Sequence, residues 1–174
     1  GTFLNQTVYA TDSSPSSLAI VDLNNDNKLD VIVTNFGSNN VGIFLNAGVG
    51  VFQNQLTYPV GVSPIGVIAI DIDADNRADV IALNMGSNTI SVLLNAGNGT
   101  LLPQNTFLTG LGPLSLAAAD LNGDNLPDIV VANDGSNTIS VLLNAGSGNF
   151  LSQTIYLAGL GPQTVALVDI DGDA

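Results

Sequence analysis

The oxygen-bearing side chains of this chain are concentrated in short segments that share one spacing. In residues 120–128, DLNGDNLPD, they stand at positions 1, 3, 5 and 9, as Asp120, Asn122, Asp124 and Asp128. A loop that curls around a point turns alternate residues inward, and Leu126 at position 7 can then offer its main-chain carbonyl. Hard cations such as Ca²⁺ take six to eight oxygens from carboxylates, amides, carbonyls and water. The spacing therefore indicates a cation-binding loop.

The same pattern occurs in three further segments. The candidate ligands there are Asp22, Asn24, Asp26 and Asp30; Asp71, Asp73, Asp75 and Asp79; and, in an incomplete fourth copy, Asp169, Asp171 and Asp173. Lys28 and Arg77 stand at position 7 and would contribute main-chain carbonyls. Position 6 is Asn27, Asn76 or Asn125, and Asn is the non-glycine residue that best tolerates the left-handed backbone of a tight loop. We expect Ca²⁺ in three complete loops and a fourth partial one.

Electrostatics favours a bound cation over an ordinary turn. All 15 acidic residues are Asp, 13 of them lie in these segments, and the chain has two basic residues. Asp and Asn also gather in turns because they bond to nearby main-chain groups, which is the alternative for any single loop. Four copies in register favour the cation, because converging carboxylates repel one another unless a positive charge lies between them. Three Ca²⁺ would change the net charge from −13 to −7, and a fourth to −5.

The segments begin at residues 22, 71, 120 and 169, a constant step of 49 that aligns the whole chain without a gap. We interpret residues 1–174 as one repeat domain with units 1–49, 50–98, 99–147 and an incomplete 148–174. A fixed period near 50 residues is typical of solenoids and propellers, whose units bury their cores against their neighbours.

Each unit has the pattern of four β-strands. Residues 17–23 and 114–120 are short apolar runs, which predict strands buried on both faces. Residues 30–35 are rich in β-branched side chains, residues 88–95 alternate, and residues 52–60 predict a polar outer strand. GSN and NAGNG predict the turns between them.

The predicted fold class is all-β, with four-stranded antiparallel units as β-propeller blades and about 3.5 blades present. A β-helix is the alternative, although its coils are usually shorter than 49 residues. Because 3.5 blades do not close a ring, we expect the chain to be part of a longer repeat protein. Open strand edges would also invite pairing with another chain or another copy.

The loops, the following DIVVAN and the segment NTISVLLNAGSGNF resemble the FG-GAP/VCBS repeat family. The resemblance covers essentially the whole chain. It implies a seven-bladed propeller in an extracellular protein, similar to that of integrin α subunits, with Ca²⁺ loops stiffening the blades along one rim. The Phe-Gly and Gly-Ala-Pro triplets of the first subfamily are missing, and position 6 is Asn instead of Gly.

Composition excludes several classes of function. The sequence has no His, Cys or Glu, so imidazole and thiolate chemistry are excluded, and its acidity argues against nucleic-acid binding. No apolar run has the length of a membrane span. We expect a non-enzymatic extracellular or cell-surface module for adhesion or structural assembly, because millimolar extracellular Ca²⁺ fills loops that cytosolic Ca²⁺ does not.

Two other functions stay open. A glycan-binding propeller would need an aromatic platform, and the chain offers Tyr9, Tyr58 and Tyr156 at equivalent positions, with Phe107 as the fourth. A propeller domain of a polysaccharide-degrading enzyme has less support, because every paired Asp already belongs to a loop. The sequons at Asn5 and Asn98 are candidate glycosylation sites.

Overall fold

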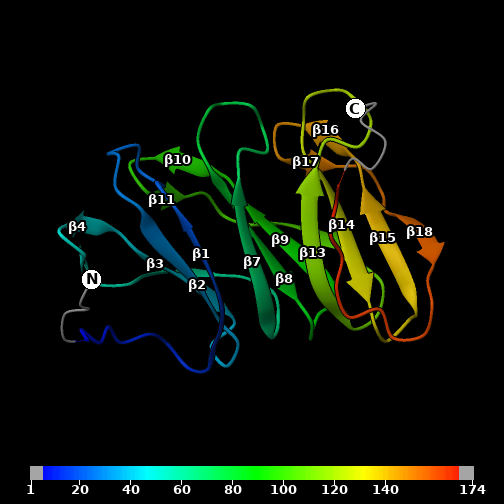
Figure 1. Cartoon of the computed structure of the whole chain (residues 1–174), viewed down its shortest axis with the longest axis horizontal. Coiled ribbons are helices and arrows are strands. Elements are labelled where there is room, and N and C mark those ends of the chain that lie inside the picture. The colour runs from blue at the N-terminus through cyan, green and yellow to red at the C-terminus, as the bar shows by residue number, and fades with distance from the viewer. Residues whose placement is uncertain (1–5, 169–174) are drawn as a thin grey trace.

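The computed structural model describes residues 6–168, which form three four-stranded antiparallel sheets and several short hairpins (Figure 1). The first sheet has the order β1-β2-β3-β6, with β1 (Pro15–Val21), β2 (Asp30–Asn35), β3 (Asn40–Phe44) and β6 (Leu56–Pro59). The second consists of β7 (Pro64–Ile70), β8 (Asp79–Asn84), β9 (Thr89–Leu93) and β12 (Asn105–Leu108). The third consists of β13 (Pro113–Ala119), β14 (Asp128–Asn133), β15 (Thr138–Leu142) and β18 (Thr154–Leu157).

The three sheets confirm the predicted fold class, since each is a four-stranded unit of the kind that forms a propeller blade. Their first strands begin at residues 15, 64 and 113, which keeps the period of 49. Each sheet spans two consecutive sequence units, because the outer strand β6 belongs to residues 50–98 but pairs with β3. The described residues include no helix long and apolar enough to cross a membrane.

The segments that begin with NAG contain turns, as predicted, but the NAG triplet itself is the first strand of a short hairpin and the turn lies in the two residues after it. The strand pairs of these hairpins are β4 (Asn46–Gly48) with β5 (Val51–Phe52), β10 (Asn95–Gly97) with β11 (Thr100–Leu101), and β16 (Asn144–Gly146) with β17 (Asn149–Phe150). In the second pair Asn98 and Gly99 both have positive φ, as a tight hairpin turn requires. A Cβ at Gly99 would lie 2.7 Å from Leu45, so this hairpin packs closely on the first sheet.

The prediction that the first strand of each unit is buried on both faces is wrong. Leu18 and Ile20 of β1 are 60% and 58% exposed, and most residues of β7 and β13 are half-buried. The second strands β2, β8 and β14 are the most buried. One physical reason is position, because a first strand has a hydrogen-bonded neighbour on one side only, whereas a second strand is flanked on both sides within its sheet. The other concerns β1, because no further sheet among the described residues covers the face that bears Leu18 and Ile20, whereas Val67, the equivalent of Leu18 in β7, is buried.

The apolar core lies between the sheets. Val41, Ile43 and Val80 belong to a cluster shared by the first two sheets, and Ile81 and Ile129 belong to one shared by the second and third. Alternate residues of β8 therefore face opposite neighbours, as expected for a sheet covered on both faces. A unit of this kind cannot bury its core alone, and packing between neighbours fixes the direction in which each loop projects.

Candidate metal centre

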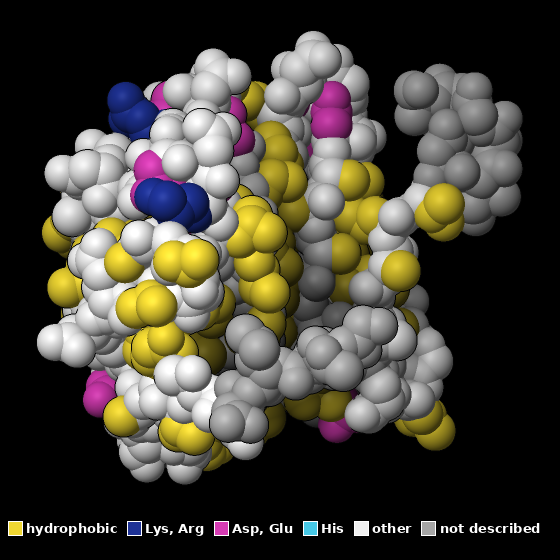
Figure 2. Space-filling model, turned by 60° about the vertical axis from the view of Figure 1, so that its left-hand side comes forward, with side chains coloured by type: hydrophobic (Ala, Val, Ile, Leu, Met, Phe, Trp, Pro, Cys, Tyr) yellow, Lys and Arg dark blue, Asp and Glu magenta, His cyan; other side chains and the backbone are white. Residues whose placement is uncertain are grey.

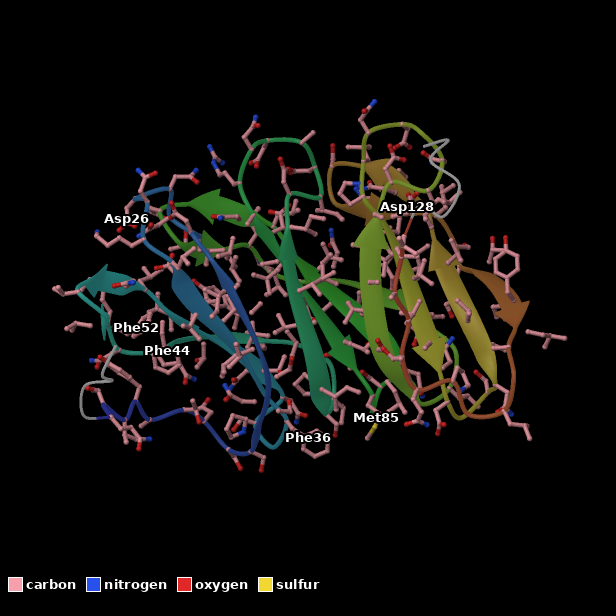
Figure 3. All side chains as sticks on the ribbon, viewed as in Figure 1. Asp26, Phe36, Phe44, Phe52, Met85 and Asp128 are labelled. Atoms are coloured by element: carbon pink, nitrogen blue, oxygen red, sulfur yellow. The ribbon has the colours of Figure 1, made fainter. Side chains whose placement is uncertain are left out.

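The three complete acidic loops lie along one rim of the molecule. They connect β1 to β2, β7 to β8 and β13 to β14, and these connections project from the same edge of the sheets (Figure 1). Asp26 and Asp128, from the first and third loops, lie at this edge (Figure 3). Figure 2 shows acidic side chains gathered along the rim beside the two basic ones, with columns of apolar side chains below. The repeat thus places the predicted ligands in one row.

Position 1 organises each loop by accepting main-chain hydrogen bonds. Asp22 Oδ1 accepts from the Asp26 N–H at 3.1 Å, and Asp22 Oδ2 accepts from the Asn27 N–H at 2.7 Å. Asp71 and Asp120 make the equivalent bonds in their loops. In the third loop these bonds, led by that from Asn125, hold the pKa of Asp120 below its usual range. The curled loop therefore forms through its own backbone.

Two positions of each loop have left-handed backbone. Asn27, Asn76 and Asn125 at position 6 have φ of 63°, 64° and 66°, which confirms the prediction made for these residues. Position 4 is left-handed as well, with φ of 57° at Asn25, 63° at Ala74 and 80° at Gly123. The sequence did not indicate this second site, because its three residues differ. Both reversals tighten the curl that brings alternate side chains together.

Position 5 closes the middle of the loop. Its carboxylate accepts the N–H of position 7 in each of the three loops that the structure describes, at 2.9 Å for Asp26 with Lys28, 2.9 Å for Asp75 with Arg77, and 2.8 Å for Asp124 with Leu126. The Lys28 ammonium lies 2.9 Å from Asp26 and, through its hydrogen bond, lowers the pKa of that carboxyl group. Exposed pairs of this kind contribute little to stability and exchange readily.

Position 9 differs from the others because it is buried. Asp30, Asp79 and Asp128 are at most 1% exposed. Each uses both carboxylate oxygens to accept main-chain N–H groups. Asp79 accepts from Ile72 at 2.9 Å and from Asn95 at 2.7 Å. Burial raises the pKa of Asp79 to about 6, against the opposing effect of these two bonds. The buried carboxylate thus lacks a full counter-charge among the groups around it.

The second loop concentrates the most carboxylate. Oxygens of Asp71, Asp73 and Asp79 all lie within 4.8 Å of one another. Asp73 Oδ1 is buried without a hydrogen-bond partner in the described part of the chain. Burial raises the pKa of Asp73, and the neighbouring carboxylates of Asp75 and Asp71 raise it further. These oxygens could hold a hard divalent cation, which would remove their repulsion and supply the missing partner.

The first and third loops carry an amide at position 3, which changes their charge balance. Asn122 Oδ1 accepts the Asp124 N–H at 3.0 Å, while its Nδ2 donates to the Asp124 carboxylate at 2.9 Å. Asn24 makes the same pair of bonds with Asp26. These loops therefore have one carboxylate fewer than the second loop, and their amide donates a hydrogen bond to the carboxylate at position 5.

The remaining predicted positions are placed as follows. Asp169, Asp171, Asp173 and Asn5 lie outside the described residues. Asn98 is exposed at the tip of the second hairpin, and its Oδ1 accepts a hydrogen bond from Thr100 at 3.0 Å. The ligand role of every loop residue stays a prediction, including the main-chain carbonyls of Lys28, Arg77 and Leu126.

The aromatic positions pack against other aromatic or apolar groups. Phe107 makes an edge-to-face contact with Phe150, with ring centroids 5.3 Å apart, and Tyr9 contacts Phe44 and Phe52 in the same way. Tyr58 packs on the first core cluster, whereas Tyr156 is 55% exposed. Packing accounts for most of these rings, with Tyr156 as the exception.

One set of residues at the rim was missed from the sequence: Asn46, Asn95 and Asn144, which follow the third strand of each sheet. Each donates its main-chain N–H to the buried Asp at position 9, over 2.7 Å in all three cases. The signal that could have identified them is the NAG triplet, which recurs at the same period of 49 as the acidic loops.

Comparison with known proteins places these observations in context. A family model described as FG-GAP-like repeat matches residues 22–82, 71–131 and 120–174. None of the curated proteins compared with the chain matches it significantly.

The solved structures that are similar to the chain include the following two. One is an Agrocybe aegerita lectin, described for its specific recognition of non-reducing terminal N-acetylglucosamine, with 23% identity, a TM-score of 0.57, and coverage of 79% of this chain and 37% of the lectin. The other is a functionally unknown protein from Desulfotomaculum acetoxidans, with 17% identity, a TM-score of 0.66, and coverage of 84% and 43%. The chain thus spans less than half the length of either, and at these identities the likeness shows the fold alone.

Proposed function

The chain belongs to the FG-GAP-like repeat family, and from this premise we propose that it is a calcium-stabilised, non-enzymatic propeller module that serves adhesion or structural assembly outside the cell. The observation that carries the proposal is the second loop, where Asp71, Asp73 and Asp79 converge and Asp73 Oδ1 is buried without a partner in the described residues. A cation at this point satisfies that oxygen and offsets the repulsion. Ca²⁺ is favoured over Mg²⁺ because many protein oxygens point at one site.

The residues that would hold the ion are Asp71, Asp73, Asp75 and Asp79, with the main-chain carbonyl of Arg77, and their equivalents in the other loops. When bound, the ion supplies positive charge and no other chemistry. The chain's own contribution is a curled backbone that holds the oxygens in place, through the bonds from Asp75 and Asn76 to Asp71. The predicted consequence is a stiffer junction between the first two strands of each sheet.

An extracellular setting follows from the affinity expected of such loops. Extracellular modules bind Ca²⁺ with dissociation constants of about 10⁻⁴ to 10⁻³ M, which extracellular Ca²⁺ saturates and cytosolic Ca²⁺ does not. An exposed sequon at Asn98 is compatible with a secreted glycoprotein, and mass spectrometry of native material would test it.

A non-enzymatic role is supported by composition and by the bonding of the acidic side chains. The sequence has no His, Cys or Glu, and the loop carboxylates are engaged by main-chain N–H groups. The matching family model names a repeat and no catalytic family. A polysaccharide-degrading activity has no observation in its favour among the described residues.

Assembly is proposed through the surfaces that the three sheets leave open. Leu18 and Ile20 expose one face of the first sheet, whereas Val67, the equivalent of Leu18 in the second sheet, is 7% exposed. Leu157 of the outer strand β18 is 92% exposed, and Leu108, its equivalent in the second sheet, is 70% exposed. Apolar faces and unpaired strand edges of this kind favour a protein partner or a second copy. Sedimentation at high concentration tests self-association, and a persistent monomer would exclude it for this chain.

The direct test of calcium stabilisation is thermal unfolding in three conditions. We expect the melting temperature to be markedly higher in 2 mM Ca²⁺ than in EDTA, with Mg²⁺ giving a smaller increase. A variant with Asp71→Asn and Asp120→Asn should lose most of the increase, whereas Asp134→Asn, which removes a charge at a turn on the opposite edge, should keep it. An equal melting temperature in Ca²⁺ and EDTA would exclude the proposal.

A glycan-binding function is the second candidate, for one specific reason. A groove of about 270 Å³ lies between the second and third sheets and is lined by Phe107, Phe150, Leu142, Ser152 and Gln153, among others. The groove combines an aromatic wall with polar groups, as sugar sites do, and the similar lectin recognises terminal N-acetylglucosamine. A glycan array tests this candidate, with Phe107→Ala, at the less buried of the two rings, as the variant that should lose any binding. An array without hits would dismiss it.

A further inference from the structure

The side-chain amide of Asn95 joins two acidic loops that belong to different sheets. Its Nδ2 donates to the carbonyl of Leu23 in the first loop at 2.8 Å and to the carbonyl of Ala78 in the second loop at 3.0 Å. Its Oδ1 accepts the Gly97 N–H at 2.9 Å, so every hydrogen-bonding group of this amide has a partner. Asn95 is 4% exposed, and these bonds are therefore shielded from water.

Asn144 repeats the arrangement one sheet further along. Its Nδ2 donates to the carbonyl of Ile72 in the second loop at 2.8 Å and to that of Pro127 in the third loop at 3.0 Å. Its Oδ1 accepts the Gly146 N–H at 2.8 Å, and the residue is 5% exposed. The bridge is therefore a feature of the repeat and recurs at both junctions between the described sheets.

These bridges connect the buried carboxylates of the three loops in one path. Leu23 accepts from Asn95 through its main-chain carbonyl and donates its main-chain N–H to Asp30, at 2.9 Å. Ile72 does the same between Asn144 and Asp79, also at 2.9 Å. Asn95 donates its own main-chain N–H to Asp79, and Asn144 donates its own to Asp128. The three buried carboxylates of Asp30, Asp79 and Asp128 are therefore linked by buried hydrogen bonds and by the residues that make them.

We propose that Asn95 and Asn144 are positioning residues that couple the acidic loops, so that a cation bound in one loop raises the affinity of the loop beside it. An ion that fixes the carboxylate at position 9 also fixes the residue at position 2, whose main-chain N–H bonds to that carboxylate. The carbonyl of the residue at position 2 accepts the side-chain amide of the Asn in the next sheet. That Asn donates its main-chain N–H to the buried Asp of its own sheet, so the Asn and this Asp are ordered at the same time. The second ion then orders fewer groups, which is positive cooperativity.

The chain contains its own control for this inference. Within its own sheet, Asn46 makes bonds equivalent to those of Asn95. It donates its N–H to Asp30 at 2.7 Å and its Nδ2 to the carbonyl of Leu29 at 3.0 Å. The described residues include no sheet before the first, and Asn46 makes no bridge to another loop among them. Asn46→Ala thus removes the local side-chain bonds to Leu29 and Gly48 without removing a bridge, whereas Asn95→Ala removes the equivalent side-chain bonds and the bridge; the main-chain N–H bond to the buried Asp is kept in both.

The test is an isothermal titration of the metal-free 174-residue chain with Ca²⁺. The inference rests on the proposed function, and the titration distinguishes the failure of one from the failure of the other. No binding would overturn both, whereas independent binding with a Hill coefficient of 1 would overturn the coupling alone. We expect a Hill coefficient above 1 for the wild type, with neighbouring affinities raised about fivefold or more.

The variants separate coupling from a general loss of structure. The double variant Asn95→Ala with Asn144→Ala should bind with a Hill coefficient of 1, and Asn46→Ala should keep the wild-type value. An equal decrease in both variants would overturn the inference, because it would show that the local bonds are responsible. If the double variant does not fold, as judged by circular dichroism, the wild-type Hill coefficient and single Asn95→Ala variant decide the question.

Discussion

The carboxylate of Asp79 lies 2.7 Å from the main-chain nitrogen of Asn95, so the last residue of the second acidic loop is bonded to the hairpin that follows the third strand. The same carboxylate accepts the Ile72 N–H at 2.9 Å through its other oxygen. A predicted cation ligand is therefore also a structural residue of the blade. This dual role allows its effects with and without Ca²⁺ to be separated by experiment.

Asp79→Asn should destabilise the chain even without a metal. An amide has one acceptor, and its NH₂ group would face the N–H of Ile72 or Asn95 at hydrogen-bond distance, leaving a buried donor unsatisfied. The expected cost is about 1 to 3 kcal/mol in the free energy of unfolding, measured by urea denaturation in EDTA. Asp134→Asn makes the same chemical change in a turn away from the loops and should change stability by less than about 0.5 kcal/mol.

Asp73→Asn should have opposite effects in the two conditions. The substitution removes a carboxylate whose pKa burial raises, and the first and third loops already carry Asn at this position. In EDTA the melting temperature should therefore rise, whereas in Ca²⁺ the gain from the ion should shrink because a charged ligand is lost. A lower melting temperature in EDTA would contradict the account of this loop as electrostatically strained.

The pH dependence of stability should change sign with calcium. Burial raises the pKa of Asp79 to about 6 from a usual value of 3.8, so the folded chain binds this proton more tightly than the unfolded chain. Without metal, the free energy of unfolding should then rise as the pH falls from 7 to 5. With Ca²⁺, acid competes with the ion and stability should fall over the same range. The check is the urea midpoint at pH 7, 6 and 5 in both conditions.

Leu83→Ala tests the packing between the second and third sheets. Leu83 is 0% exposed and belongs to the core cluster that these sheets share. The substitution should cost about 2 to 5 kcal/mol, because it leaves a cavity that rigid sheets fill poorly. Leu102→Ala, at a position 45% exposed, is the matched control and should cost far less. Equal costs would contradict a core located between the sheets.

The parts of this structure that sequence reasoning predicted are those set by local spacing. The period of 49 located the sheets, because it can be read from the spacing of the acidic segments. The positions of Asp71, Asp73 and Asp75 indicated a curled loop, because alternate residues of one short segment determine that shape. The left-handed Asn76 followed from the same local argument.

What the sequence did not indicate depends on packing between sheets. The bond from Asn95 to Leu23 joins residues 72 positions apart and arises only once the second hairpin rests on the first loop. The exposure of Leu18 and Ile20 was missed because the sequence of a short apolar run does not show whether another sheet covers the strand. Strands of two or three residues, such as β10 and β11, are too short for periodicity to reveal.

The most direct measurement of the central claim is the calcium content of the chain at equilibrium. The metal-free chain would be dialysed against 2 mM Ca²⁺, and the ion bound per chain would be determined by atomic emission, with Mg²⁺ in excess as a competitor. The account predicts about one ion for each complete loop, retained against Mg²⁺, and the loss of one ion in Asp71→Asn. A calcium content no higher than that of the dialysis buffer would contradict it.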